Sequence, residues 1–257
     1  MLGIGVVGPL YYFFHYVFSP VDIYMASDAR LTSLAYTRTV LPAMALMYYV
    51  PHFMADFAAS PVTRMKWNWF WQMFPVWVTA IQYLAKWTGL SADTEQHDRI
   101  HNPVRDVPWL RATIGLMATL SAGVWIYTLR NTPVSLVEMF VPTLNAPSEL
   151  IPFLRNFVQF DHIFCFSSSL IWLALLIHDL KVAGMTKASW FSIVSIGVSV
   201  TVVAGPAAAV GLGWLWRENI LATRRHKGAI VETTVISATD KPFTDSNAKV
   251  ANGHNKH

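Results

Sequence analysis

Apolar residues form long runs in this chain, and short polar segments separate these runs between residues 2 and 216. Most runs contain about 17–25 residues, the length that an α-helix needs to cross a bilayer. The pattern therefore predicts six membrane-spanning helices, at residues 2–18, 40–58, 68–90, 110–129, 160–181 and 189–216. The last run is long and is interrupted by Gly205-Pro206.

Residues 132–159 fit neither a loop nor a continuous span. They are apolar but are broken by four prolines, Pro133, Pro142, Pro147 and Pro152. We interpret them as a re-entrant or interfacial segment under the bundle, with a seventh span as the alternative. Residues 219–257 are polar without apolar periodicity, which predicts a disordered tail. The expected organisation is a helical catalytic domain, 1–218, followed by the tail, 219–257.

Basic residues fix the expected orientation. Arg224, Arg225 and Lys227 follow the last span, so the positive-inside rule places the tail in the cytosol. The basic residues between the second and third spans agree with this orientation, whereas those after the fifth span do not. The sequence thus predicts a multi-pass protein, which we assign to the endoplasmic reticulum.

Composition supports the same class. Of 257 residues, 54% are hydrophobic and 13% are charged, whereas soluble domains carry about 25% charged residues. We therefore predict an all-α transmembrane bundle that has the lipid bilayer as a partner. The net charge of +4 gives no indication of nucleic-acid binding, and the single Cys165 excludes an intrachain disulfide. The oligomeric state stays open.

Polar residues recur on one face of the fifth span. At 100° per residue, Asp161, Cys165, Ser168, Trp172 and Asp179 share this face, which we call the polar stripe. Ionisable groups inside a membrane usually point into a bundle or a wet cavity. Asp161 is a candidate general acid if burial keeps it protonated, and an N-terminal helix cap is the alternative. Asp179 is interpreted as a solvated helix end.

Two further spans carry candidate lining residues. Tyr48, His52 and Asp56 follow each other at intervals of four residues and share a helix face. They form either a second wall of the polar site or an interfacial His–Asp pair. The third span is rich in tryptophan, whose ring faces stabilise cations by about 0.5–2 kcal/mol each. A cavity lined in this way suits a carbocation, although belt and core positions explain any single tryptophan equally simply.

Several common chemistries lack their residues here. His97 and His101 form an HxxxH pair, but a membrane di-iron site needs further histidine boxes. The chain has no paired aspartate-rich motifs for Mg-diphosphate and no GxSxG elbow. These absences leave acid chemistry on a hydrophobic substrate without metal or cofactor, or no chemistry at all.

A family resemblance rests on several runs and on Val50-Pro51. The runs are GPLYYFFHYVFSP (8–20), SDARLTSLAYTRTVLPA (27–43), WQMFPVWV (71–78), QFDHIFCFSSSLIWLAL (159–175) and GPAAAVGLGWLWRE (205–218). Together they resemble the small integral-membrane terpene cyclases of fungal meroterpenoid pathways, in particular the ascofuranone-type family. The resemblance implies cyclisation of a farnesyl-type chain on an aromatic or polyketide head group. It also implies a buried acid donor and aromatic walls, but no motif aligns that acid with one position here.

The resulting hypothesis is a terpene cyclase acting on a hydrophobic prenylated small molecule. Asp161, chosen from geometry, protonates an epoxide or olefin, and His52 with Asp56 removes the final proton. The expected substrate-binding residues are Tyr48, Trp69, Gln72, Trp77, Ser168 and Trp172. The alternatives are a membrane transporter or scaffold for a hydrophobic metabolite, and a sterol-type double-bond isomerase.

Overall fold

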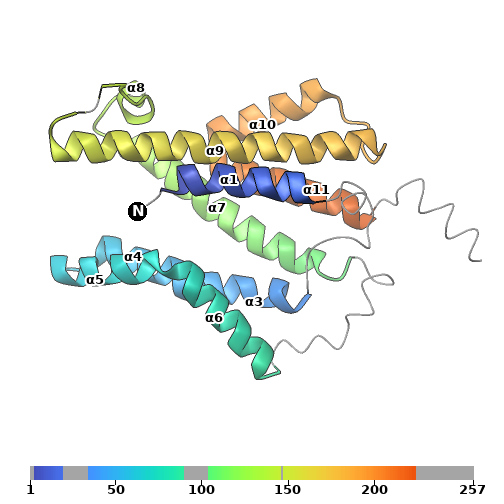
Figure 1. Ribbon diagram of the computed structural model, residues 1–257, viewed down its shortest axis with the longest axis horizontal. Coiled ribbons are helices and arrows are strands. Elements are labelled where there is room, and N and C mark those ends of the chain that lie inside the picture. Colours follow the sequence, from blue (N-terminus) through green and yellow to red (C-terminus); the bar gives the residue numbers. More distant parts are fainter. Residues whose placement is uncertain (1–2, 20–33, 90–103, 146, 224–257) are drawn as a thin grey trace, which may run out of the picture.

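The computed structural model describes residues 3–19, 34–89, 104–145 and 147–223, and every regular element in them is helical (Figure 1). The all-α class is therefore confirmed for this part of the chain. In chain order the elements are α1 (Ile4–Phe18), α3 (Leu34–Met44), a π-helical turn (Ala45–Tyr49), α4 (Val50–Phe57), α5 (Pro61–Gln72), α6 (Phe74–Trp87), α7 (Val107–Asn131), α8 (Leu136–Phe140), α9 (Leu150–Val182), α10 (Trp190–Ala204) and α11 (Pro206–Thr223).

The longest helix, α9, organises the packing. Helix α1 lies along it, and α11 packs on both α9 and α7 (Figure 1). Helix α7 contacts α3, which packs on α6, while α4 folds back on α5. The chain thus forms two parts joined through α7, one built on α9 and the other containing α3 to α6.

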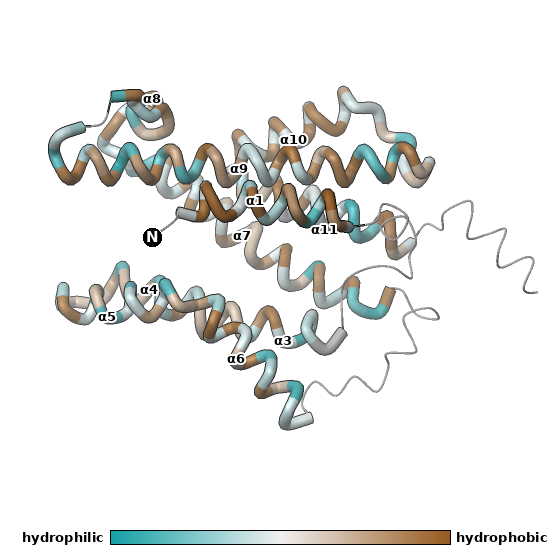
Figure 2. Tube along the Cα trace, viewed as in Figure 1, coloured by the Kyte–Doolittle hydropathy of each residue, from teal (hydrophilic) through white to brown (hydrophobic). Residues whose placement is uncertain are grey.

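Little of the apolar surface is buried. One compact cluster joins α9 to α11 through Leu180, Met185, Ile220 and Leu221. Most other large apolar side chains are exposed, and Figure 2 shows that hydrophobic residues recur along α1, α9 and α10. Exposed apolar surface on this scale marks a binding or membrane surface.

Only part of the predicted span pattern is found. Among the described residues, α7 and α9 are long and apolar enough to cross a membrane, whereas α1 and α10 are apolar but shorter. The six-span arrangement is therefore not confirmed. The physical reason is that three expected spans are interrupted: 40–58 by the π-helical turn, 68–90 at Met73, and 189–216 at Gly205.

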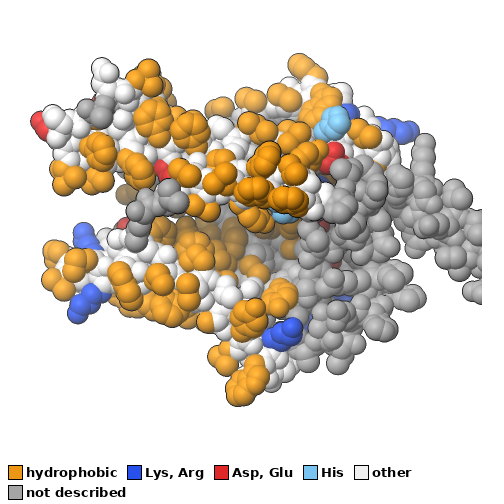
Figure 3. All heavy atoms as spheres, in the orientation of Figure 1, with side chains coloured by type: hydrophobic (Ala, Val, Ile, Leu, Met, Phe, Trp, Pro, Cys, Tyr) orange, Lys and Arg blue, Asp and Glu red, His pale blue; other side chains and the backbone are white. Residues whose placement is uncertain are grey.

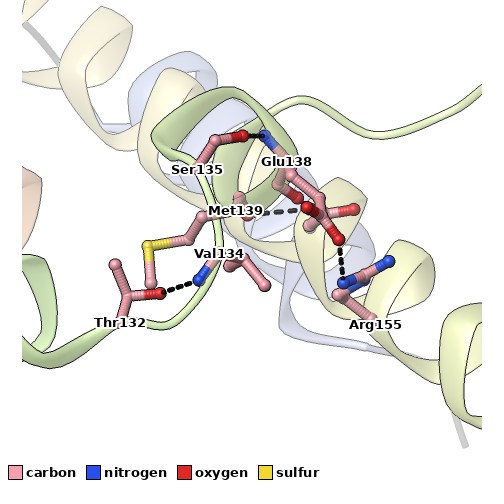
Figure 4. Close-up of polar contacts among 7 residues, drawn as sticks. Thr132, Val134, Ser135, Glu138, Met139 and Arg155 are labelled. Atoms are coloured by element: carbon pink, nitrogen blue, oxygen red, sulfur yellow. Dashed lines mark hydrogen bonds and ion pairs between the residues drawn. The ribbon is translucent and has the colours of Figure 1, made fainter.

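The segment expected to be re-entrant or interfacial contains α8, whose five residues are too short for a seventh crossing. Ser135 caps α8 by accepting the Glu138 N–H, and Arg155 of α9 pairs with Glu138 at 2.8 Å (Figure 4). Gln159 of α9 donates to the carbonyls of Glu138 and Met139. These bonds hold α8 on the first turns of α9, which begins ten residues before the predicted span.

The helical domain also ends later than the predicted boundary at residue 218. Helix α11 continues to Thr223, and Ile220, Leu221 and Ala222 are buried in it. The expected tail therefore starts no earlier than residue 224, and residues 224–257 lie outside the described part of the chain.

Proline chemistry explains the break between α10 and α11. Pro206 has no N–H to donate to the carbonyl of Val202, its helical partner four residues earlier. The indole Nε1–H of Trp125 on α7 donates to this carbonyl instead, at 3.0 Å. Gly205 takes φ +87° and ψ 159°, and a Cβ there would lie 3.0 Å from the Trp125 ring. Both the backbone conformation and the ring contact require glycine.

Replacing Gly205 by alanine should therefore destabilise the protein by about 1–3 kcal/mol, the cost of a backbone conformation that only glycine adopts readily. Thermal unfolding in detergent, followed by circular dichroism, measures the change. Gly197→Ala in the same helix is the matched control, because nothing lies within 4 Å of its added Cβ. Equal melting temperatures for the two variants would contradict this account of the break.

Candidate functional site

The polar stripe on α9 faces α1, and its side chains bond to that helix. The contacts, which together define the α1–α9 seam, are Gly5 N–H to Asp161 Oδ1 at 2.6 Å, Ser169 Oγ to Tyr12 Oη at 3.1 Å, Trp172 Nε1 to His15 Nδ1 at 3.2 Å, and Tyr16 Oη to Asp179 Oδ1 at 3.2 Å. Tyr12 also stacks on Trp172, with 4.9 Å between ring centroids. The stripe is thus mainly a helix–helix interface.

Asp161 caps a helix, but not its own. It lies eleven residues after Leu150, the first residue of α9, so the alternative interpretation of Asp161 as the N-terminal cap of that helix is wrong. Its carboxylate instead accepts the Gly5 N–H in the first turn of α1. This position satisfies one of the free amides in the first turn of α1. Its Oδ2 atom has no hydrogen bond within the described residues.

Glycines at the start of α1 permit this approach. A Cβ on Gly5 would lie 2.6 Å from the Asp161 carbonyl oxygen and 2.7 Å from its Cα, and a Cβ on Gly3 would overlap the carboxylate. Because backbone atoms cannot swing aside, the first turn of α1 requires glycine here. Further along, Tyr12, His15 and Tyr16 share one helix face through their spacing of three and four residues.

The remaining stripe residues differ from expectation. Ser168 bonds to the Cys165 carbonyl within α9, and the neighbouring Ser169 reaches α1 instead. Asp179, interpreted as a solvated helix end, is only 8% exposed and accepts the Tyr16 hydroxyl. The sequence suggested a solvated residue because Asp179 lies only two positions before Lys181.

Sequence reasoning also missed a buried ion pair on α11. Arg217 and Glu218 lie 2.5 Å apart, with 5% and 4% of their side chains exposed. They follow an apolar run and look in the sequence like a solvated helix end. Burying two charges is costly unless they are paired and hydrogen-bonded, and here the Arg217 guanidinium donates to the Glu218 carboxylate.

A second group of side chains gathers on α4, α5 and α6. The π-helical turn precedes Pro51, a residue that disturbs a regular α-helix, and this local geometry sets Tyr48 and His52 beside α5 and α6. Ring centroids lie 6.1 Å apart for Tyr48–His52, 5.7 Å for Tyr48–Trp71 and 5.4 Å for His52–Trp71. Phe74 meets Tyr48 edge-on at 4.9 Å. We call Tyr48, His52, Trp71 and Phe74 the aromatic cluster.

The predicted base pair lies at the edge of this cluster. His52 Nε2 and Asp56 Oδ2 are 3.6 Å apart, close enough for an ion pair but too far for a hydrogen bond. Their side chains are 40% and 56% exposed. The structure therefore brings the pair together but leaves it open on one side.

The other predicted lining residues are more scattered. Trp69 is 65% exposed, and Gln72 is also exposed. Trp77 stacks on Phe70 at 5.1 Å and donates its indole N–H to the Phe70 carbonyl. Trp71 and Phe74, which the sequence did not single out as lining residues, lie beside Tyr48 in the aromatic cluster.

The seam and the aromatic cluster belong to different parts of the molecule, the first to α1 and α9 and the second to the π-helical turn, α4, α5 and α6. Figure 3 shows a cleft between the part built on α9 and the part containing α4 and α5, with hydrophobic side chains along both walls. In Figure 1 the first turn of α1, which Asp161 caps, lies at the same end of the molecule as α4 and α5. Within the described residues no hydrogen bond or ion pair joins Asp161 to the His52–Asp56 pair.

Metal ligands do not gather in the described part of the chain. No group of three or more His, Cys, Asp or Glu side chains occurs there that could hold an ion. His97 and His101 lie outside the described residues.

The seam predicts opposite effects for two neighbouring glycines. Gly5→Ala should lower the free energy of unfolding by about 1–3 kcal/mol, because the new methyl group overlaps the α9 backbone. Gly8→Ala should leave stability unchanged or raise it, because its Cβ would meet only Tyr12 at 3.9 Å and alanine favours helix. Chemical denaturation in mixed micelles measures both. Similar losses in the two variants would contradict the close approach at Asp161.

Curated relatives of this chain are fungal proteins. It is 39% identical over 235 residues to "FAD-dependent monooxygenase verC1" of Penicillium polonicum, an alignment that covers 90% of this chain and 29% of the relative. It is 37% identical over 235 residues to "FAD-dependent monooxygenase anuJ" of Penicillium roqueforti, covering 90% and 28%. The chain thus spans less than a third of the length of these relatives. No solved structure matches it.

The names of the relatives raise the question of whether this segment could hold a flavin. Gly3, Gly5 and Gly8 have the G-x-G-x-x-G spacing of dinucleotide-binding loops. That loop must follow a strand and leave room for a pyrophosphate. Here the glycines open α1, no strand occurs in the described residues, and the Asp161 carboxylate fills the space beside Gly3 and Gly5. The described residues therefore do not fit the flavin.

A family model supplies the assignment. The model named CtvD domain matches residues 1–222, which include both halves of the candidate site and every helix described above except the last residue of α11. The chain therefore belongs to the CtvD-domain family.

Proposed function

We propose that this chain is a membrane-embedded cyclase of fungal secondary metabolism. It protonates an epoxide or an olefin in the prenyl chain of a meroterpenoid and guides the carbocation to a ring. The observation that carries the proposal is the cleft of Figure 3, which has hydrophobic side chains along both walls. It lies between the part built on α9, the helix that carries Asp161, and the part that contains α4, the helix that carries the His52–Asp56 pair.

The relatives support an epoxide rather than an olefin. They are named as flavin-dependent monooxygenases, yet the segment shared with this chain is helical in its described residues and does not fit a flavin. The shared segment then performs a different step from oxygen transfer. Oxygen transfer to an alkene gives an epoxide, and an epoxide needs acid to open, so the two steps follow each other chemically.

Asp161 is the proposed proton donor. Its Oδ1 atom holds the Gly5 N–H, which fixes the carboxyl group, while Oδ2 delivers a proton to the epoxide oxygen. The C–O bond at the more substituted carbon breaks, and its electrons remain on the oxygen, which becomes a hydroxyl group. The electron pair of a neighbouring double bond then attacks this carbon and forms the new C–C bond. The resulting cation loses a proton to His52, which Asp56 supports, and the proton balance closes with a product isomeric to the substrate.

Aromatic rings would stabilise the cation along this path. Faces of Tyr48 and Trp71 provide about 0.5–2 kcal/mol each toward a nearby positive charge. Trp172 is held by His15 and Tyr12, so it acts as a fixed wall on the α9 side. Fixed walls are useful in this chemistry because the fold of the bound chain decides which bond forms.

The bilayer is the proposed environment of the protein and the source of its substrate. Helices α7 and α9 have the length and hydropathy to span it, and the exposed apolar side chains fit lipid contact. An orientation with the C-terminal tail in the cytosol and a location in the endoplasmic reticulum complete this proposal.

The test uses membranes from cells that express the full chain, incubated with a 10,11-epoxyfarnesyl-substituted phenol. Mass spectrometry should detect a cyclic product of unchanged mass, whereas epoxide hydrolysis would add the mass of one water. Transport of unchanged substrate across liposomes by the purified protein, without turnover, would instead support the transporter alternative.

Asp161→Asn should reduce turnover by at least about 100-fold, the usual contribution of a general acid. The asparagine side-chain oxygen can still accept the Gly5 N–H, so the seam and the fold should persist. Glu149→Gln, at the exposed start of α9, is the matched control and should retain activity. Full turnover by Asp161→Asn would rule out Asp161 as the donor and direct attention to the buried carboxyl group of Asp179.

A further inference from the structure

We propose that Tyr48, His52 and Trp71 form a subsite for a flat, conjugated group that carries a neutral oxygen acceptor, such as an aryl ketone, at one end of the substrate. The inference rests on the proposed function, since it names the part of the same hydrophobic substrate that the α4–α5 side of the cleft recognises.

Two polar atoms of this cluster have no hydrogen-bond partner among the described residues. They are the indole Nε1 of Trp71, which is buried, and the Tyr48 hydroxyl. The charged contact of His52 in the same part of the chain is the 3.6 Å approach to Asp56. A buried donor without a partner costs about 1–3 kcal/mol, and such a group in a native structure calls for a ligand, a water or a functional explanation.

The seam shows the contrast. There the side chains of Asp161, Trp172 and Asp179 each bond to α1, so these groups are already paired in the folded chain. Polar groups that pair with each other hold helices together. Polar groups that converge without pairing, inside apolar surroundings, are the usual mark of a small-molecule site.

Lipid cannot supply the missing partners. The neighbouring Phe53 and Phe57 are 42% and 77% exposed, so this side of the molecule presents apolar surface. Hydrocarbon offers no hydrogen bonds to an indole or a phenol. An oxygen atom carried by the substrate would satisfy them in a place where acyl chains cannot.

Ring geometry indicates the shape of the ligand. The centroids of Tyr48, His52 and Trp71 form a triangle with sides of 5.4–6.1 Å. Planar rings stack favourably on such surfaces at centroid distances of about 4.5–7 Å. His52 is the open corner, with 40% of its side chain exposed, and the ligand enters there as the His52 or Trp71 ring turns to uncover the indole N–H.

The charge of Asp56 indicates that the oxygen acceptor on the proposed ligand is neutral. The ionisable side chain in contact with His52 is the acidic Asp56. A carboxylate or phosphate on the ligand would be repelled by it. A neutral carbonyl, by contrast, accepts a hydrogen bond from Trp71 without bringing a charge into the cluster.

The test compares two probes that differ only in the acceptor, a farnesyl-substituted acetophenone and the corresponding farnesyl-substituted ethylbenzene. Isothermal titration of the purified full chain in detergent gives the Kd of each probe without requiring turnover. The wild type should bind the ketone about tenfold more tightly, the value of one hydrogen bond to an otherwise unpaired donor. Trp71→Phe keeps a ring but removes the N–H, and should bring the two Kd values together.

Trp87→Phe is the control, because Trp87 is 85% exposed on α6 and should leave the tenfold preference intact. The proposal is overturned if Trp71→Phe keeps the preference, if it weakens both probes equally, or if the wild type shows no preference. A ketone preference in a protein that cyclises nothing would support the subsite while refuting the cyclase, so the two failures are distinguishable.

Discussion

The hydrogen bond from the Gly5 N–H to the Asp161 carboxylate fixes the first turn of α1 against the middle of α9. It demands glycine at residues 3 and 5, because any Cβ there meets Asp161. Once this contact sets the register, the tyrosines and the histidine of α1 meet Ser169, Trp172 and Asp179 in order along α9. The rest of the α9 half is built on this pairing, since α11 packs against the same long helix.

Pairing also separates structural polar groups from candidate ligand-binding ones. On the seam, each polar side chain of α9 that faces α1 has a partner, which lowers the cost of placing it among apolar neighbours. On the α4–α5 side, the indole Nε1 of Trp71 is buried without a hydrogen-bond partner among the described residues. The exposed fractions of the side chains do not separate these two sets. Their hydrogen bonds do, and they support the proposal that the aromatic cluster binds a ligand.

Local periodicity predicted much of the fold but little of its tertiary pairing. The position of α7 was predicted to within three residues at each end, and the 3.6-residue period correctly placed Asp161, Trp172 and Asp179 on one face. The partner of that face was not predictable, because α1 lies more than 140 residues away in the chain. Met73 shows a similar limit: nothing in methionine itself signals a helix break, which here precedes Pro75 near the start of α6.

The two aspartates of α9, the partly buried Asp161 and the buried Asp179, are not equivalent for chemistry. They are separated by eighteen residues, or about 27 Å along a helix that rises 1.5 Å per residue. Helix α9 starts on the side of the molecule that holds α4 and α5 and ends near the C-terminal end of α11 (Figure 1), so Asp161 lies nearer to α4 and α5 along this helix than Asp179 does. In the proposed cyclisation, a prenyl chain with its head group on Trp71 would therefore reach Asp161 before Asp179. This arrangement favours Asp161 as the proposed proton donor, whereas Asp179 bonds to Tyr16 near the far end of α1.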